Sequence, residues 1–147
     1  NAGVNTVALR DGSGDITANF FRGTATKASY ADLAEKYTTE SEYSVGTVVA
    51  VCEHEEHEMA LATPASVVAG VISEKPAYLM NADADGQAIA LKGRVPVRVI
   101  GPVRKGEKVF VAQDGLASVE GQGDLVGVAL ESNSEVSEKL IECFLKV

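Results

Sequence analysis

Alternation of apolar and polar side chains is clearest between residues 70 and 101. Two runs rich in β-branched and apolar residues, 70–81 and 87–101, flank a polar turn that contains glycine. In the second run, one set of alternate positions is Val95, Val97 and Val99, and the other is Arg94, Pro96, Arg98 and Ile100. A period of two predicts a half-buried strand. Pro96 has no N–H to donate to a ladder, so we expect it at a sheet edge or a bulge.

Shorter runs of the same kind fill the rest of residues 45–147. They predict strands at 45–52, 59–62, 66–73, 109–112, 116–119, 125–130 and 139–147. Turn-forming residues separate these runs, and Gln113-Asp114-Gly115 is a tight hairpin signal. Regular short strands of this kind predict a mainly β protein, with an all-antiparallel β barrel or sandwich over residues 45–147.

Residues 1–27 have a different pattern, which predicts a hairpin with strands at 6–10 and 16–21. The intervening run Asp11-Gly12-Ser13-Gly14-Asp15 contains residue types that tolerate turns. A two-stranded hairpin is marginal in water on its own. We therefore expect this shaft-like segment to pack against copies of itself or against an upstream stalk.

Residues 28–37 form the one helix candidate, followed by a polar linker up to residue 44. Ala, Leu, Glu and Lys favour helices, and Ser29 is in place to cap one. Tyr30, Leu33, Ala34 and Tyr37 fall at i, i+3, i+4 and i+7, which makes one apolar stripe. A helix this short needs a docking surface. The stripe is predicted either to pack on its own domain or to form an oligomer interface in a three-chain collar.

Composition narrows the class of protein. The chain has 147 residues, no Trp, 46% hydrophobic and 23% charged residues, and a net charge of −8. These values are typical of one globular domain with a short appendage. The negative charge argues against nucleic acid and against an anionic membrane surface, and we expect no membrane insertion. The first residue is Asn, which suggests an excised or processed C-terminal piece of a longer chain.

Two groups of residues are candidates for special chemistry. Cys52 and Cys143 lie in apolar strand-like runs, which favours buried free thiols over a disulfide. The acidic run 53–58 contains His54 and His57, only three residues apart, whereas the zinc-protease pattern needs two His four apart on a helix. We interpret this run as a solvated hairpin loop. A divalent site for Zn or Ni that uses His54, His57 and Glu residues is the alternative.

The N-terminal residues carry a resemblance to a known family. The run 5–16, with 20–28 after it, is similar to the short repeat of bacteriophage tail-fibre proteins. In such fibres three chains wind together into a β-rich shaft. The string 30–37 also resembles the junction that precedes the C-terminal domain of many phage fibre and virion structural proteins.

The C-terminal residues carry a second resemblance. Its motifs stand in order at Gly70–Ser73, Pro76–Asn81, Ala90–Val99, Gly101–Glu107 and Val126–Glu131. They resemble the C-terminal domain of phage fibre and other virion structural proteins. The layout is also similar to the autoproteolytic intramolecular-chaperone domain of phage neck appendages, which assists trimer folding and then cleaves itself from the fibre. The resemblance implies a virion location after synthesis in the host cytoplasm.

Little in the sequence favours an enzyme. Ser73 and Lys75 are spaced to share a strand face as a nucleophile and base, but a turn leading into Pro76 explains them as well. Self-cleavage would need a nucleophile near the linker, and the hydroxyls there are those of Ser29, Thr38, Thr39, Ser41 and Ser44. The glycines at 12, 14, 121 and 123 lack the context of a nucleotide loop, and no cofactor is expected.

The favoured hypothesis is a phage fibre-type structural protein, not an enzyme. We expect a homotrimer that acts in trimer assembly, in capping of the fibre or in attachment to a host-surface receptor, with other virion proteins as further partners. Loops 53–58 and 81–86 are the candidate contact loops of a receptor-binding tip. A self-cleaving intramolecular chaperone and a capsid or tail decoration module are the alternatives.

Overall fold

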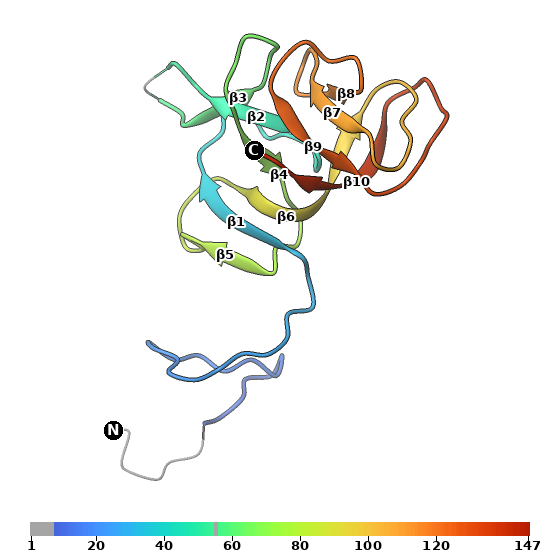
Figure 1. The fold of residues 1–147 in the computed structure, drawn as a ribbon. Helices are drawn as coiled ribbons and strands as arrows, with labels where there is room; N and C mark the ends of the chain where they lie inside the picture. Colours follow the sequence, from blue (N-terminus) through green and yellow to red (C-terminus); the bar gives the residue numbers. More distant parts are fainter. Residues whose placement is uncertain (1–7, 55) are drawn as a thin grey trace.

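The computed structural model describes residues 8–54 and 56–147, which contain ten strands and no helix. The strands are β1 Asp32–Tyr37, β2 Val48–Val51, β3 Met59–Leu61, β4 Val68–Ile72, β5 Tyr78–Met80, β6 Gln87–Val99, β7 Lys108–Val111, β8 Ala117–Ser118, β9 Leu125–Ala129 and β10 Lys139–Leu145. They form one body, from which the N-terminal segment extends downward in Figure 1. Within the described residues, nothing helical is long and apolar enough to cross a membrane.

Strand β6 connects the two halves of the body. Its first half pairs with β1 and β4, and its second half pairs with β10 and, through Val99, with β8. The path from β6 through β10, β9, β7 and β8 returns to β6, so these strands close a five-stranded barrel. The predicted mainly β barrel is therefore confirmed. The prediction that all pairings within residues 45–147 are antiparallel is wrong, because β6 pairs with β8 in parallel. Outside that range, β1 also pairs with β5 in parallel.

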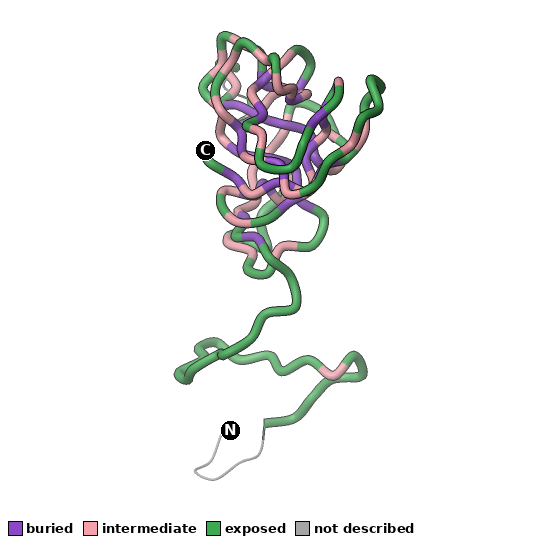
Figure 2. The backbone as a smooth tube through the Cα atoms, turned by 45° about the vertical axis from the view of Figure 1, so that its right-hand side comes forward, coloured by how far each residue is buried: buried purple, intermediate pink, exposed green. Residues whose placement is uncertain are grey.

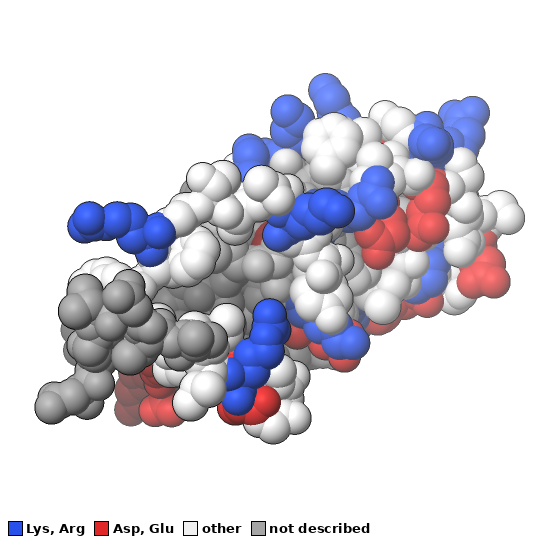
Figure 3. Space-filling view, turned by 90° about the horizontal axis from the view of Figure 1, so that it is seen from below, with Lys and Arg blue, Asp and Glu red and all other residues white. Residues whose placement is uncertain are grey.

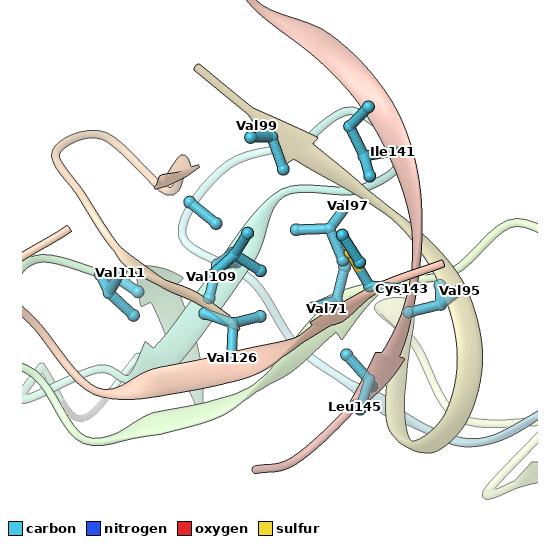
Figure 4. Packing of buried hydrophobic residues seen from close by; sticks show 14 of the residues in the cluster. Val71, Val95, Val97, Val99, Val109, Val111, Val126, Ile141, Cys143 and Leu145 are labelled. Atoms are coloured by element: carbon cyan, nitrogen blue, oxygen red, sulfur yellow. The ribbon is translucent and has the colours of Figure 1, made fainter. Parts of the chain in front are cut away.

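The alternation of apolar and polar residues in β6 and β10 arises, as predicted, because one face of each strand is buried. Val95, Val97 and Val99 are buried, and they face the buried side chains that β10 contributes to the same core. Figure 4 shows these valines together with Ile141, Cys143 and Leu145 inside the barrel. Valine suits such a core because its branched side chain packs well on a pleated surface.

Pro96 lies where the sequence predicts it, at a locally unpaired edge. It stands opposite Glu142 of β10. Its neighbours Arg94 and Arg98 turn their N–H groups away from β10 and donate them to the carbonyls of Ala31 and Gly46. The nitrogen of Pro96 faces the same side, where no strand of the described chain is paired with it. The missing N–H therefore leaves no ladder hydrogen bond unmade.

The N-terminal segment lacks the predicted shaft structure. Residues 8–31 form no strand and are almost entirely exposed, as Figure 2 shows. The predicted strand at 16–21 is therefore wrong, and part of the strand predicted at 6–10 falls outside the described residues. The turn at 11–15 is present, because the Asp11 carboxylate accepts the N–H groups of Ser13 and Asp15. Within a single chain, the segment has no surface against which a hairpin could bury its apolar side chains.

The predicted helix at 28–37 is also wrong, because residues 32–37 form β1. This strand pairs with β6 on one side and with β5 on the other. Two neighbouring strands satisfy more of its backbone groups than a short exposed helix would, so tertiary pairing overrides the helix propensity. The sheet therefore begins at Asp32.

The stripe predicted as an oligomer interface does not exist as a helical face. Ala34 is fully buried in its own domain, and Tyr37 is half-buried beside the smaller core cluster of Val49 and its neighbours. Tyr30 and Leu33 remain exposed. An oligomer interface at these last two residues stays a prediction.

Candidate functional site

The extended segment meets the body at a cleft of about 250 Å³, here called the junction cleft. Its walls come from the start of β1, the residues that follow β4, the middle of β6 and one residue of β10. The lining residues are Tyr30, Ala31, Asp32, Ser73, Glu74, Lys75, Arg94, Val95, Pro96 and Glu142. The cleft thus combines three carboxylates, two cations and two hydroxyls, those of Ser73 and Tyr30.

Gly93 allows the chain to enter the body at this point. Its φ of +102° is in the left-handed region, and a Cβ there would lie 2.3 Å from the carbonyl oxygen of Ala31. That carbonyl accepts the N–H of Arg94 at 3.1 Å, and the next carbonyl, that of Asp32, accepts the N–H of Ala77 at 2.8 Å. Only glycine permits so close a backbone approach. The register shift between Leu33 and Ala34 follows directly after it.

Asp32 is the unusual residue of the junction cleft. Its side chain is 6% exposed, and its Oδ2 atom has no hydrogen-bond partner within the described structure. Neither Lys75 nor Arg94 forms an ion pair with it in the described part of the chain. A carboxylate taken out of water without a partner is unfavourable. This buried oxygen is therefore available to accept a hydrogen bond from a donor or a cation.

The structure brings Ser73 and Lys75 to the same cleft as Asp32. Ser73 is buried, and its N–H donates to the carbonyl of Ala88 at 2.9 Å, whereas Lys75 is exposed. No hydrogen bond joins the hydroxyl of Ser73 to the amine of Lys75 among the described residues. Ser73 and Lys75 follow β4 and lie in no strand, so they share no strand face, and the turn leading into Pro76 is the interpretation that fits. The sequence analysis misses Asp32, which no motif singles out.

The linker hydroxyls have structural roles away from the cleft. The hydroxyl of Thr38 bonds to the carboxylate and the backbone of Glu58, and that of Thr39 donates to Gln87 at 3.1 Å. Ser44 lies 3.5 Å from the hydroxyl of Thr47. Ser29 and Ser41 are exposed. None of these hydroxyls lines the junction cleft.

An apolar groove of about 340 Å³ continues from the cleft and is here called the junction groove. It shares Tyr30, Ala31 and Asp32 with the cleft, and Leu33, Ala77, Tyr78, Lys92 and Gly93 complete it. Tyr78 is 67% exposed and begins β5, which pairs with β1 alone among the described strands. The groove therefore presents an apolar surface beside a free strand edge.

The acidic loop 53–58 joins β2 to β3 as the predicted hairpin. His54 is exposed and His57 is half-buried. In residues 8–54 and 56–147, no three or more His, Cys, Asp or Glu residues gather so as to hold a metal ion. A depression of about 660 Å³ includes His54, Cys52 and Glu40 on its wall.

The larger cleft on the opposite part of the body offers less chemistry. It has a volume of about 710 Å³ and is bordered by serines and by the Arg104–Glu107 ion pair. Its side chains already bond to the protein: Ser132 accepts the N–H of Lys105 at 2.8 Å, and Asn133 accepts that of Glu135 at 2.9 Å. These residues shape loops.

Two pKa values are perturbed away from the junction. The pKa of Tyr37 rises to about 12, first because its hydroxyl donates to Glu35 at 2.6 Å and then because of burial. Asn81 donates to the other oxygen of the same carboxylate at 2.7 Å. Burial raises the pKa of Cys143 to about 12. Cys52 and Cys143 are both free thiols, the first half-buried and the second buried.

The barrel with an extended N-terminal segment is a fold that solved structures of a bacteriophage protein share. The fold matches the pre-mature bacteriophage phi29 gene product 12, with a TM-score of 0.63 and 17% identity over 91% of this chain. It also matches the C-terminal fragment of that gene product, with a TM-score of 0.58 and 16% identity over 78% of this chain and 100% of the fragment. The resemblance to phage fibre C-terminal domains is thereby confirmed at the level of the fold.

This chain spans 24% of the length of the pre-mature protein that it matches. No protein-family model matches the sequence, and no curated protein matches it either.

Proposed function

We propose that this chain is the C-terminal domain of a bacteriophage virion structural protein, a tail fibre or appendage, and that it works as a homotrimer. The observation that carries the proposal is the fold match to phi29 gene product 12 over 91% of the chain. That share is larger than the β body alone, so the match extends into the N-terminal segment.

The exposed side chains of the segment support self-association. Leu9, Ile16, Phe20 and Phe21 are all largely exposed on an extended chain, and the two phenylalanines are 93% and 79% exposed. Burying a phenylalanine side chain contributes about 1.5–3 kcal/mol. Large apolar side chains that are exposed along one segment are typical of an interaction surface. Three copies wound around one another would bury them.

Within a virion, such a domain would register three chains, cap the fibre or contact a host-surface receptor. The loop 53–58 lies at the end of the body away from the N-terminal segment, as Figure 1 shows. It is therefore the better placed of the two candidate tip loops, because the loop 81–86 lies against β1, where Asn81 donates to Glu35 and Gly86 approaches the carbonyl of Tyr37. Other virion proteins would be reached through the segment.

The solution mass of residues 1–147 tests this proposal, measured beside a version that lacks 1–28. The truncation stops ahead of Tyr30, because β1 belongs to the sheet. Both core clusters lie within residues 48–145, so the shortened chain keeps its whole core. A Phe20→Ser, Phe21→Ser double variant serves as a full-length control.

We expect the full chain to be a trimer and the shortened one a monomer, which assigns oligomerisation to the segment. If both are trimers, the β body itself registers the chains, as expected of a chaperone domain. If both are monomers, the fibre proposal is wrong and a capsid or tail decoration module becomes the better hypothesis.

One observation favours a self-cleaving chaperone as a second candidate. The unpartnered carboxylate of Asp32 lies where the segment enters the body, beside Ser73 and Lys75. The C-terminal fragment of gene product 12 matches 78% of this chain over its whole length. In hydrolysis at this junction, Asp32 would take a proton from water, the water oxygen would bond to a backbone carbonyl carbon, the C–N bond would break, and the proton would pass to the new amino terminus.

Intact-mass measurement of the purified chain over days tests this second candidate. The expected fragments end between residues 29 and 33, and the Asp32→Asn variant should remain whole. A full-length chain that never fragments, with or without upstream phage residues, rules out self-cleavage and leaves the structural proposal in place.

A further inference from the structure

The side chains that line the junction groove and the junction cleft indicate which kind of ligand would bind there. The groove needs an apolar, preferably aromatic group, because Tyr30, Leu33 and Tyr78 line it and are exposed. The cleft, which adjoins it through Tyr30, Ala31 and Asp32, needs a cation or donor for Oδ2 of Asp32. A ligand that fits both places an aromatic ring and a positive charge a few ångströms apart.

The N-terminal segment of this chain carries that pair of groups. Phe20 and Arg22 are two residues apart, so in an extended chain their side chains project from the same side, about 7 Å apart. Phe21 projects from the other side. Phe20 is 93% exposed in the single chain.

Charge favours the same pairing. Two of the 21 acidic and three of the 13 basic residues precede Asp32, so the body carries 19 acidic and 10 basic residues. Between residues 16 and 31 the only charged residues are Arg22 and Lys27. Figure 3, which views the molecule from the end that carries the segment, shows basic and acidic side chains intermixed on this face. A positive segment and a negative body attract each other.

We propose that residues 16–28 of a second copy of this chain bind at the junction, with Phe20 in the junction groove and Arg22 at Asp32. The free edge of β5 lies beside the groove and can pair with an extended backbone. The proposal rests on the proposed self-association and adds to it a defined contact: the segment of one copy binds the body of its neighbour, in addition to any contact between segments.

Photo-cross-linking from position 20 tests this contact directly. Phe20→p-benzoylphenylalanine chains are prepared with and without heavy-isotope labelling, mixed by unfolding and refolding, and irradiated. Mass spectrometry of the cross-linked peptides identifies both partners, and mixed isotopes show that two copies are joined. The solution mass of the same sample reports the oligomeric state independently.

We expect mixed-isotope cross-links from position 20 to Leu33, Tyr78 or their neighbours. An oligomer whose cross-links from position 20 reach only other segments, or that yields no cross-link to the junction groove, overturns this inference while leaving the proposed trimer intact. Cross-links within one copy show that the segment folds back on its own body and also overturn it. A monomer overturns both.

A double-mutant cycle tests the charged contact. Arg22→Gln and Asp32→Asn should each weaken association on the order of tenfold or more, because each leaves the other charge without its partner. The double variant should be no weaker than either single variant, since the two residues act as a pair. Arg10→Gln is the matched control, because Arg10 donates to Gly14 of its own turn, and it should leave association unchanged. Additive effects, or an equal effect of Arg10→Gln, contradict a specific Arg22–Asp32 contact.

Discussion

Replacing Gly93 by alanine should destabilise the β body more than its backbone conformation alone explains. Gly93 stands in β6 opposite Asp32, with a φ of +102°. A Cβ at this position would lie 2.3 Å from the carbonyl oxygen of Ala31 and 3.0 Å from the Cα of Asp32. Both are backbone atoms of β1 or its entry, so neither can rotate away.

The expected cost has two parts. A left-handed φ at an alanine costs roughly 1–2 kcal/mol. Forcing an extra methyl against fixed backbone adds about 1–3 kcal/mol. The sum, about 2–5 kcal/mol, is a large fraction of the roughly 5–15 kcal/mol that stabilises an ordinary domain. Relief of the clash would move β1 away from β6 and open the junction cleft.

Gly101 supplies a matched control two residues after the same strand. Its φ is +85°, but the nearest atom to an added Cβ is the hydroxyl of Ser118 at 4.0 Å. Gly101→Ala should therefore lower the free energy of unfolding only by the conformational cost of roughly 1–2 kcal/mol. Chemical denaturation followed by circular dichroism gives both free energies of unfolding. If the two variants lose the same stability, the close approach of Ala31 to β6 is not a feature of the folded protein and the reasoning is refuted.

Further predictions concern groups elsewhere in the body. Burial raises the pKa of Cys143 from 9.0 to about 12, so the folded state holds the thiol proton more tightly than the unfolded state does. The stabilisation that results is fully present below pH 9 and is lost as the pH rises towards 12. Cys143→Ala should remove this part of the pH dependence of the free energy of unfolding. Glu35→Gln should lower the pKa of Tyr37 from about 12 towards 10.0 in an ultraviolet titration, and an unchanged titration would show that their hydrogen bond does not hold the proton. Arg98→Ala should lower the free energy of unfolding by about 1–3 kcal/mol in chemical denaturation, because Arg98 donates to the fully buried hydroxyl of Thr47 at 2.9 Å. A loss below about 0.5 kcal/mol, the size expected of an ordinary surface substitution, would contradict that role.

The strands of the barrel could be predicted where one face is buried and the other is not. Val95, Val97 and Val99 alternate with polar residues because one face of β6 lines the core. The last strand follows the same rule through Ile141 and Cys143. In such strands the physical requirement is written directly into the order of residues.

Strand β1 could not be predicted in this way. It contains helix-forming residues, and both of its faces carry polar groups, because Asp32 and Lys36 lie on the side of Ala34. Its strand conformation comes from pairing with β6 and β5, which are remote in sequence. The parallel pairings depend equally on distant partners, so no local pattern indicates them.

The candidate site was only partly visible in the sequence. Ser73 and Lys75 were recognisable as a spaced pair, and the structure places both at the junction cleft. Asp32 carried no signal, since a single aspartate in a run of helix formers is ordinary. Its importance comes from burial without a partner, which is a property of the folded chain alone.

The position of β10 in the barrel has a consequence for biosynthesis. Of the ten described strands, β10 is made last, yet it closes the barrel by pairing with both β6 and β9. A nascent chain therefore exposes the N-terminal segment well before the body can fold, because β6 cannot pair with β10 until β10 has been synthesised. If partners meet on the ribosome, the segments would find one another first, and each barrel would close afterwards on chains already held together.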